Sequence, residues 1–206
     1  MAKDEVRMAD TYEIETAFYL NGKEIVFGVD KKAELSYMVG LCSINPIFGF
    51  EQYYNCIATN SYAEAMQEFG QRINAEAELA LETQKERGIF DTLTIDDCIP
   101  GSRNGDYEGE LVVIRADILQ RDKQTADYQL CRATGGFGCK ASAGGRAVFC
   151  QTVFDNREMR YDRTDVLGVI KPERIPDWAK ERIATREQHR TVTERDLPPI
   201  FAYKKC

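Results

Sequence analysis

Five glycines lie within residues 133–146, in the segment ATGGFGCKASAGGR. Glycine-rich loops can bind phosphate through their backbone N–H groups. A Walker A loop needs Gly-Lys-Ser/Thr, but here Cys139 separates Gly138 from Lys140. A dinucleotide-binding loop needs a helix directly after the glycines, and this sequence predicts a strand there. We therefore interpret the segment as a long hairpin loop, with contact to a partner as its alternative role.

Cysteine supplies the next candidate chemistry. Cys98, Cys131, Cys139 and Cys150 could together bind zinc as four thiolates, but no C-x-x-C pair occurs among them. Cys131 and Cys150 lie in apolar runs that are typical of packed free thiols. No metal and no cofactor are expected, although a zinc site stays open as an alternative. A further alternative is an enzyme that uses Cys139 as its nucleophile, with Lys140 beside it lowering the thiol pKa.

Basic residues gather in the same part of the chain. On a sheet, such side chains could line one face and bind phosphate groups. Asp162 and Asp165 lie among them and weaken the positive field. The residues predicted to bind nucleic acid are Arg132, Lys140, Arg146, Arg157, Arg160 and Arg163.

Composition limits the possible classes of protein. The chain has 206 residues, 43% of them hydrophobic, with a formal net charge of −7 and a single histidine, His189. No run approaches the roughly 20 apolar residues of a membrane span. The polar N-terminus does not resemble a signal peptide, so a cytoplasmic protein of a bacterial host is expected. One histidine excludes a His-rich metal site and argues against a Ser-His-Asp triad.

The charge is divided unevenly along the sequence. Residues 1–100 contain 8 basic and 18 acidic side chains, a net charge of −10. Residues 101–206 contain 19 basic and 16 acidic side chains, a net charge of +3. The turn-rich segment 98–109 lies where this balance changes. We therefore expect two regions, 1–98 and 99–206, that pack as one unit.

The N-terminal region is predicted to hold a hairpin and two helices. Asn21-Gly22 joins two alternating strands over 12–20 and 23–29, which is a strong hairpin signal. Asp30 could begin a short helix over 31–42, with Leu35, Met38, Val39 and Cys42 on one face. A long helix is predicted over 62–87, between a Ser61/Glu64 capping box and Gly88.

An acidic helix face and an aromatic stretch form the predicted partner-binding surface. A row of glutamates can orient a basic partner, while aromatic side chains supply contact energy. A solvated helix face and ordinary core packing are the alternatives for these two features. The residues assigned to partner binding are Glu64, Glu68, Glu76, Glu78 and Glu82 on the helix, and Phe48, Phe50, Tyr53 and Tyr54 in the aromatic stretch.

The C-terminal region is predicted to be mainly strands followed by one helix. The overall class is therefore α+β: an N-terminal hairpin and helices, then a mainly antiparallel sheet with a C-terminal helix. The predicted strands lie in 110–119, 126–134, 146–154, 157–163 and 165–170, and the helix covers 176–188.

Three segments of this region resemble a module carried on plasmids, conjugative transposons and phages of gut Firmicutes. They are YQLCRATGGFGC (128–139), GRAVFC (145–150) and RYDRTDVLGVIKPERIPDWAKERI (160–183). The resemblance assigns no catalytic residue. It implies an anti-defence context, and within that context the chain resembles an anti-CRISPR protein directed at a type II effector nuclease.

We therefore expect a protein that is not an enzyme. It would inhibit a CRISPR effector ribonucleoprotein, the type II nuclease with its guide RNA, by stoichiometric binding. An acidic protein can compete for the positively charged nucleic-acid channels of a CRISPR effector. The alternative is a nucleic-acid-binding accessory protein of conjugation or replication, which would use the arginines and the glycine-rich loop.

Overall fold

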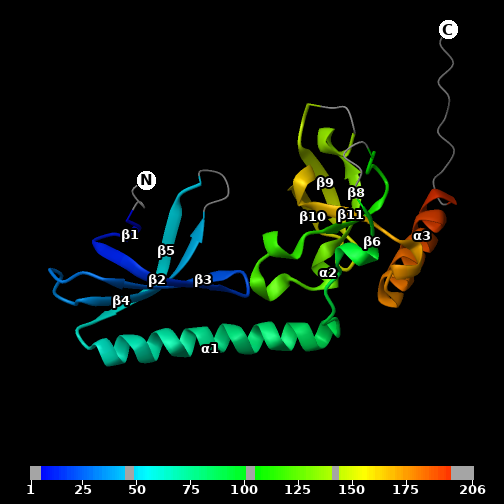
Figure 1. Cartoon of the computed structure of the whole chain (residues 1–206). Coiled ribbons are helices and arrows are strands. Elements are labelled where there is room, and N and C mark those ends of the chain that lie inside the picture. The colour runs from blue at the N-terminus through cyan, green and yellow to red at the C-terminus, as the bar shows by residue number, and fades with distance from the viewer. Residues whose placement is uncertain (1–5, 45–48, 101–104, 141–143, 196–206) are drawn as a thin grey trace, which may run out of the picture. The chain divides into compact units, whose positions relative to one another are not determined.

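The computed structural model describes residues 6–44, 49–100, 105–140 and 144–195 (Figure 1). The chain forms two compact units: Met1–Ile89 with Gln120–Asp122, and Phe90–Leu119 with Lys123–Cys206. Antiparallel sheets and helices make up the described part, so the predicted α+β class is confirmed.

The first unit contains a five-stranded antiparallel sheet in the order β1-β2-β3-β4-β5. The predicted hairpin is present as β2 and β3, and its turn residues Asn21 and Gly22 have φ values of 53° and 79°. Positive φ at both positions is what a two-residue hairpin turn requires. The strand bounds are Met8–Ala9 (β1), Tyr12–Leu20 (β2), Lys23–Val29 (β3), Tyr37–Ile44 (β4) and Glu51–Thr59 (β5).

The helix predicted over 31–42 is wrong, because residues 31–36 form turns and residues 37–42 belong to strand β4. β4 lies between β3 and β5, and Val39 is opposite Phe27 on β3. Pairing on both sides satisfies the backbone of β4 and outweighs the helical spacing of its apolar residues. Asp30 caps a turn instead, since its Oδ1 accepts a hydrogen bond of 2.8 Å from the N–H of Lys32.

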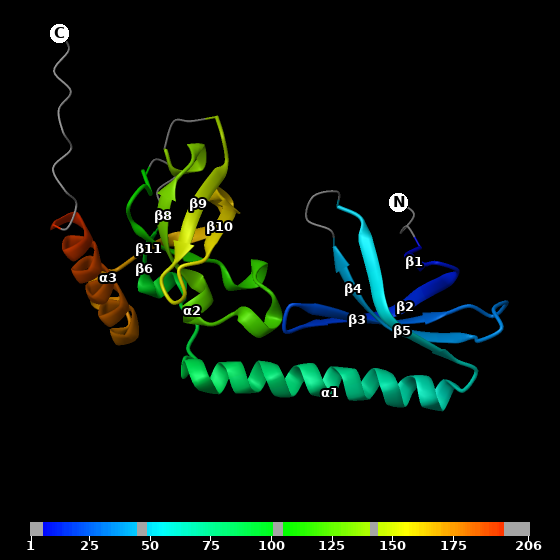
Figure 2. The ribbon, with the colours of Figure 1, turned by 180° about the vertical axis from the view of Figure 1, so that it is seen from behind.

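The long helix α1 covers Tyr62–Arg87, as predicted. Ser61 Oγ accepts the N–H of Glu64 at 3.3 Å, and Gly88 ends the helix with φ 65° while donating to Gln84 O. α1 lies along one face of the sheet (Figures 1 and 2). The core between them contains Ile25, Phe27, Val39, Ala65 and Phe69.

The second unit contains a six-stranded antiparallel sheet in the order β10-β9-β8-β7-β11-β6. The predicted strands are present in part: 126–129 is a helical turn before its strand, and within the strand predicted over 110–119 only 111–114 is strand, because 116–118 forms a 3-10 helix. The bounds are Cys98–Pro100 (β6), Leu111–Ile114 (β7), Ala126–Gln129 (α2), Leu130–Gly135 (β8), Ala147–Thr152 (β9), Glu158–Asp162 (β10), Val166–Ile170 (β11) and Asp177–Arg195 (α3).

A large hydrophobic cluster of the second unit lies on one face of this sheet, while Val113 and Leu130 are buried on the other face. The cluster includes Tyr107, Val112, Ile114, Val148 and Tyr161. The helix predicted over 176–188 is present as α3, which extends further, and its Trp178 ring lies 5.9 Å from that of Phe154. α3 is therefore fixed to the turn that follows β9.

The change between units falls at Ile89/Phe90, nine residues before the boundary that the sequence predicts at 98/99. The short segment Gln120–Asp122 returns to the first unit, where Asp122 Oδ2 accepts the N–H of Asn21 at 2.8 Å. Joint packing of the two regions stays a prediction. Over the described ranges, no helix is both long and apolar enough to span a bilayer.

Candidate functional site

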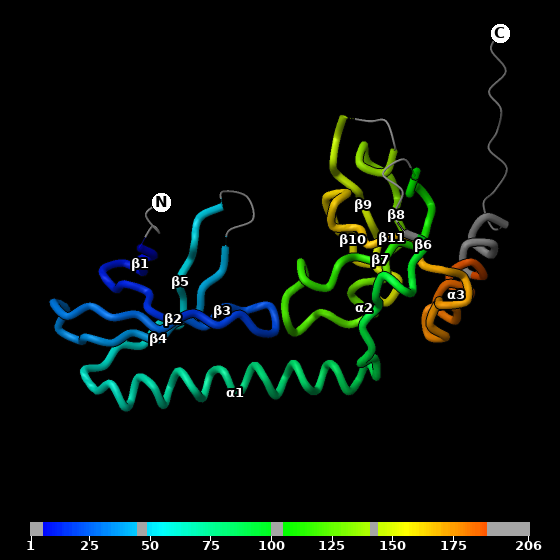
Figure 3. Tube along the Cα trace, in the orientation of Figure 1, coloured from blue at the N-terminus to red at the C-terminus, as the bar shows by residue number. Residues whose placement is uncertain are grey.

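The glycine-rich segment links β8 to β9 (Figure 3) and contains an exposed aromatic side chain, Phe137. Phe137 begins the short helix η4 (Phe137–Cys139) and is 73% exposed. Its side chain lies against Gly145, where an added Cβ would stand 2.5 Å from Phe137 Cβ. The glycine therefore allows the ring to lie close against the backbone. Residues 141–143 of this segment lie outside the described residues.

A second exposed ring lies on the neighbouring strand. Phe149 on β9 is 49% exposed and is opposite Gly135 on β8 and Arg160 on β10. An added Cβ at Gly136 would collide with Ala147 O and lie 2.9 Å from Phe149 Cδ2, so the close approach of this segment to β9 and to the ring requires a glycine. The pairing places an exposed phenyl ring next to a guanidinium group on the outer face of the sheet.

We call Phe137, Phe149, Arg146 and Arg160 the aromatic–arginine surface. Arg146 and Arg160 are both largely exposed and share Asp162, at 3.2 and 3.9 Å. One carboxylate between two guanidinium groups leaves a net positive charge. Exposed rings beside such charge can stack on nucleic-acid bases while the arginines bind phosphates.

Of the other predicted nucleic-acid residues, Arg163 does not belong to this surface. Its guanidinium donates to the carbonyls of Gly105 at 2.5 Å and Cys139 at 3.0 Å, and it lies 4.3 Å from the centre of the Tyr107 ring. It also donates to Gly138 O. Arg163 thus ties the glycine-rich segment to residues 105–107, which is a structural role.

The remaining three basic residues are placed differently. Lys140 is exposed at the end of η4. Arg157 pairs with Asp155 at 2.9 Å. Arg132 lies opposite Gln151 of β9, on the same face as Phe149, and donates to Gly109 O at 3.1 Å. Arg132 therefore continues the basic surface across the sheet.

Three of the four candidate zinc-binding cysteines share a core. Cys131, Cys139 and Cys150 are buried together, whereas Cys98 lies elsewhere and its Sγ is 3.4 Å from Thr94 O. Within the described ranges, no three His, Cys, Asp or Glu side chains are grouped as metal ligands. The structure gives no support to a zinc site at these residues.

The alternative of Cys139 as a nucleophile does not fit the structure. The side chain is buried, and its Sγ lies 2.9 Å from Gly135 O. Burial raises the pKa of the Cys139 thiol, and the charge of Asp106 acts in the same direction. An activated cysteine needs the opposite shift.

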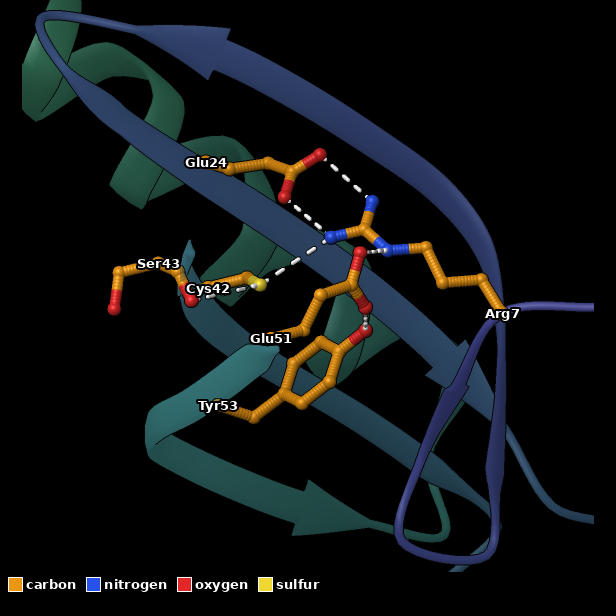
Figure 4. Close-up of polar contacts among 6 residues, drawn as sticks. All are labelled: Arg7, Glu24, Cys42, Ser43, Glu51 and Tyr53. Carbon is orange, nitrogen blue, oxygen red and sulfur yellow. Dashed lines mark hydrogen bonds and ion pairs between the residues drawn. The ribbon is translucent and has the colours of Figure 1, made fainter. Parts of the chain in front are cut away.

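An ion cluster in the first unit surrounds Arg7 (Figure 4). The guanidinium pairs with Glu24 at 2.5 Å and Glu51 at 2.7 Å, and it lies 3.3 Å from Cys42 Sγ. The hydroxyl of Tyr53 donates a hydrogen bond to Glu51, and the Arg7 guanidinium lies 5.9 Å from the centre of the Tyr53 ring. The cluster therefore joins the segment before β1 to β3, β4 and β5.

The electrostatics of this cluster favour stability over reactivity. Hydrogen bonding to Glu24 raises the pKa of Arg7, against the effect of burial. Burial raises the pKa of the Cys42 thiol, and the charge of Glu24 adds to this. Burial also raises the pKa of Tyr53, as does its bond to Glu51. Neither the thiol nor the phenol is therefore prepared to act as a nucleophile near neutral pH.

The predicted acidic face of α1 is incomplete because Glu76 points toward the sheet. It is 8% exposed and accepts hydrogen bonds from Lys23 at 2.6 Å and Asn21 at 3.0 Å. Position 76 follows Phe69 and Ala65 at helical spacing, so it belongs to the packed side of the helix. The expectation of an outward Glu76 is wrong.

The other predicted glutamates lie toward solvent, but three of them have local partners. Glu64 accepts from Thr59 at 2.7 Å, Glu68 pairs with Arg72 at 2.7 Å, and Glu78 accepts from Asn74 at 3.0 Å. Glu82 is also exposed. The partner of Glu78 is a neutral amide, and no basic side chain among the described residues pairs with Glu78 or Glu82, so these two exposed carboxylates remain suited to an external basic partner.

The predicted aromatic stretch is only partly available. Phe48 lies outside the described residues. Phe50 and Tyr54 are exposed, while Tyr53 is half-buried and belongs to the ion cluster. Partner binding by Phe50 and Tyr54 stays a prediction.

Sequence reasoning missed Phe137 and Phe149, although a signal existed for Phe149. Val148 and Cys150 flank it on an alternating strand, so their burial requires Phe149 to face outward. For Phe137, the signal was a large apolar residue among five glycines. No family model, curated protein or solved structure matches this chain, so the assignment depends on this geometry.

Proposed function

We propose that the protein binds single-stranded nucleic acid through the aromatic–arginine surface. The observation that carries this proposal is the exposed Phe149 ring opposite Arg160 on the adjacent strand. Stacking of a base on such a ring contributes about 1–3 kcal/mol, and every base offers a stacking face. Phe137, Arg146 and Lys140 extend the same chemistry, and the protein acts here without catalysis.

Fluorescence anisotropy with labelled single-stranded DNA and RNA, read across a salt series, tests the proposal. We expect the affinity to fall steeply with salt, because each phosphate contact releases bound counterions. Phe149→Ala should weaken binding by about tenfold, as expected for one lost stacked base. Arg160→Gln should weaken binding and also flatten the salt dependence.

Arg174→Gln is the matched control, because Arg174 is exposed in the same unit but outside this surface. It should bind like the wild type. If neither strand binds at low salt, or if Arg174→Gln loses as much affinity as Arg160→Gln, the proposed interface is wrong.

The resemblance to a mobile-element module supports a second candidate function, inhibition of a type II CRISPR effector nuclease by stoichiometric binding. The structural observation in its favour is the outward placement of Glu78, Glu82, Phe50 and Tyr54 on the first unit. Exposed acids and aromatics suit a basic protein surface. The two functions are compatible, since an inhibitor can bind an effector that carries its guide or target strand.

Co-purification with candidate effectors, with and without guide RNA, followed by a DNA-cleavage assay, tests this second function. The double variant Glu78→Lys/Glu82→Lys should weaken inhibition. Glu13→Lys/Glu15→Lys provides a control of equal charge change, because both residues are exposed on β2. Equal inhibition by the wild type and the α1 double variant would remove α1 from the interface.

A further inference from the structure

A cavity of about 320 Å³ opens beside the outer face of the second sheet. Arg132 and Gln151 line it from β8 and β9, and Asn156 lines it from the turn after β9. Arg186 and Ile183 approach from α3. The lining therefore combines two guanidinium groups and two amides with an apolar side, to which Val153 also contributes.

Arg186 is the unusual member of this lining. It is half-buried, and within the described part of the chain it forms neither a hydrogen bond nor an ion pair. Burial lowers the pKa of its guanidinium, and the charges of Arg182 and Arg132 act in the same direction, while Asp155 opposes them. A half-buried cation under the influence of two other cations, with Asp155 as the opposing charge, is stabilised when a further anion binds beside it.

We propose that this cavity binds a phosphomonoester, with Arg132 and Arg186 holding the phosphate. The forked guanidinium suits phosphate oxygens, and a terminal phosphate carries up to two negative charges for the two arginines. The volume lies at the lower end of small-ligand sites, which fits a mononucleotide and not a long polymer.

The other lining groups favour a nucleotide over inorganic phosphate. Gln151 and Asn156 offer both donors and acceptors, which base edges and sugar hydroxyls need. Val153 and Ile183 provide an apolar wall for a sugar or a base. Glu187 also lines the cavity, and its carboxylate disfavours ligands with several phosphates.

The phosphate can come from a free nucleoside monophosphate or from the phosphorylated end of a strand. The second source rests on the proposed function, because Gln151 lies two residues from Phe149 on the same face of β9. A strand stacked on Phe149 could then place its end near the cavity.

Isothermal titration of the full chain with adenosine 5′-monophosphate, and with adenosine as the unphosphorylated control, tests the site. We expect the phosphate to add at least about tenfold in affinity, because its charged oxygens accept charge-assisted hydrogen bonds from the two guanidinium groups. A parallel anisotropy experiment compares 5′-phosphorylated and 5′-hydroxyl oligonucleotides of one sequence. Preference for the phosphorylated strand without nucleotide binding assigns the site to strand ends, whereas nucleotide binding assigns it to free nucleotides.

Arg186→Gln should remove the preference for phosphate in either experiment, and Arg174→Gln should keep it. Because Arg186 has no hydrogen-bond or ion-pair partner among the described residues, Arg186→Gln should keep or raise the melting temperature, so its loss of binding is not loss of folding. A phosphate preference that is absent, or that survives Arg186→Gln, overturns the site. Phe149→Ala separates the two proposals, since it should weaken strand binding and leave nucleotide binding unchanged.

Discussion

Phe137 lies so close to Gly145 that a methyl group on the glycine would stand 2.5 Å from Phe137 Cβ. Gly145→Ala should therefore displace the ring and weaken single-stranded nucleic-acid binding by several-fold, toward the loss expected for one stacked base. Anisotropy at fixed salt measures this change.

Gly144 provides the control for this prediction. An added Cβ at Gly144 meets nothing within 4 Å, so Gly144→Ala changes the same segment without pressing on the ring. Its affinity should match that of the wild type. Equal losses in both alanine variants would mean that flexibility of the segment, and not the position of Phe137, determines binding.

Arg160 and Arg163 lie three residues apart but should respond oppositely to substitution. Arg163→Gln removes hydrogen bonds to Gly105 and Cys139 and should lower the free energy of unfolding by about 3 kcal/mol. Arg160→Gln should leave stability nearly unchanged and reduce nucleic-acid affinity. Chemical denaturation and anisotropy on both variants provide the comparison, and a stable Arg163→Gln protein would refute the structural role of Arg163.

Glu76 makes the stability of the first unit depend on pH. Burial acts to raise its pKa, but hydrogen bonds from Lys23 and Asn21 hold the pKa below its ordinary value of 4.5. A depressed pKa in the folded state means that the stabilisation is complete above the unfolded value and is lost as the pH falls through the folded value. Glu76→Gln should cost about 1–2 kcal/mol at pH 7 and less at pH 3.

Denaturation of the Glu76→Gln and Glu78→Gln variants at pH 7 and pH 3 measures this effect. Glu78 is exposed on the same helix, so the free energy of unfolding of Glu78→Gln should match that of the wild type at both pH values. A cost of Glu76→Gln that does not shrink in acid would show that its ion pair with Lys23 contributes little.

The cysteines should differ sharply in their reactivity. Burial raises the pKa of Cys150 to about 12, so almost no thiolate forms there at pH 8. Cys56 is exposed. Brief iodoacetamide treatment of the native protein, followed by peptide mapping, should modify Cys56 well before Cys131, Cys139 or Cys150. Early modification of Cys139 would restore it as a candidate nucleophile.

Local signals predicted the elements that their own residues define. Ser61 and Gly88 set both ends of α1, and Asn21-Gly22 set the first hairpin. The helix prediction over 31–42 was wrong because the spacing of the apolar residues fits a helix. The strand at 37–42 depends instead on pairing with β3 and β5. The strand prediction at 126–129 was wrong because a single helical turn of four residues is too short to show a helical hydrophobic period.

The candidate surface was predicted in its composition but not in its arrangement. The sequence identified the arginines and the glycines, but it could not show that Arg163 turns inward to carbonyls up to 58 residues away. It also could not show that Glu76 meets Lys23, 53 residues earlier in the chain. Such pairings depend on tertiary contacts between distant segments, which no local pattern encodes.

The return of Gln120–Asp122 to the first unit has a consequence for how the gene can be cut and recombined. The chain passes between the two units three times, at residues 89/90, 119/120 and 122/123. A single recombination break anywhere along the gene therefore cannot exchange one intact unit for another. A break after residue 89 would separate Asn21 from the Asp122 carboxylate that accepts its N–H. A single crossover therefore cannot pass on either unit intact by itself.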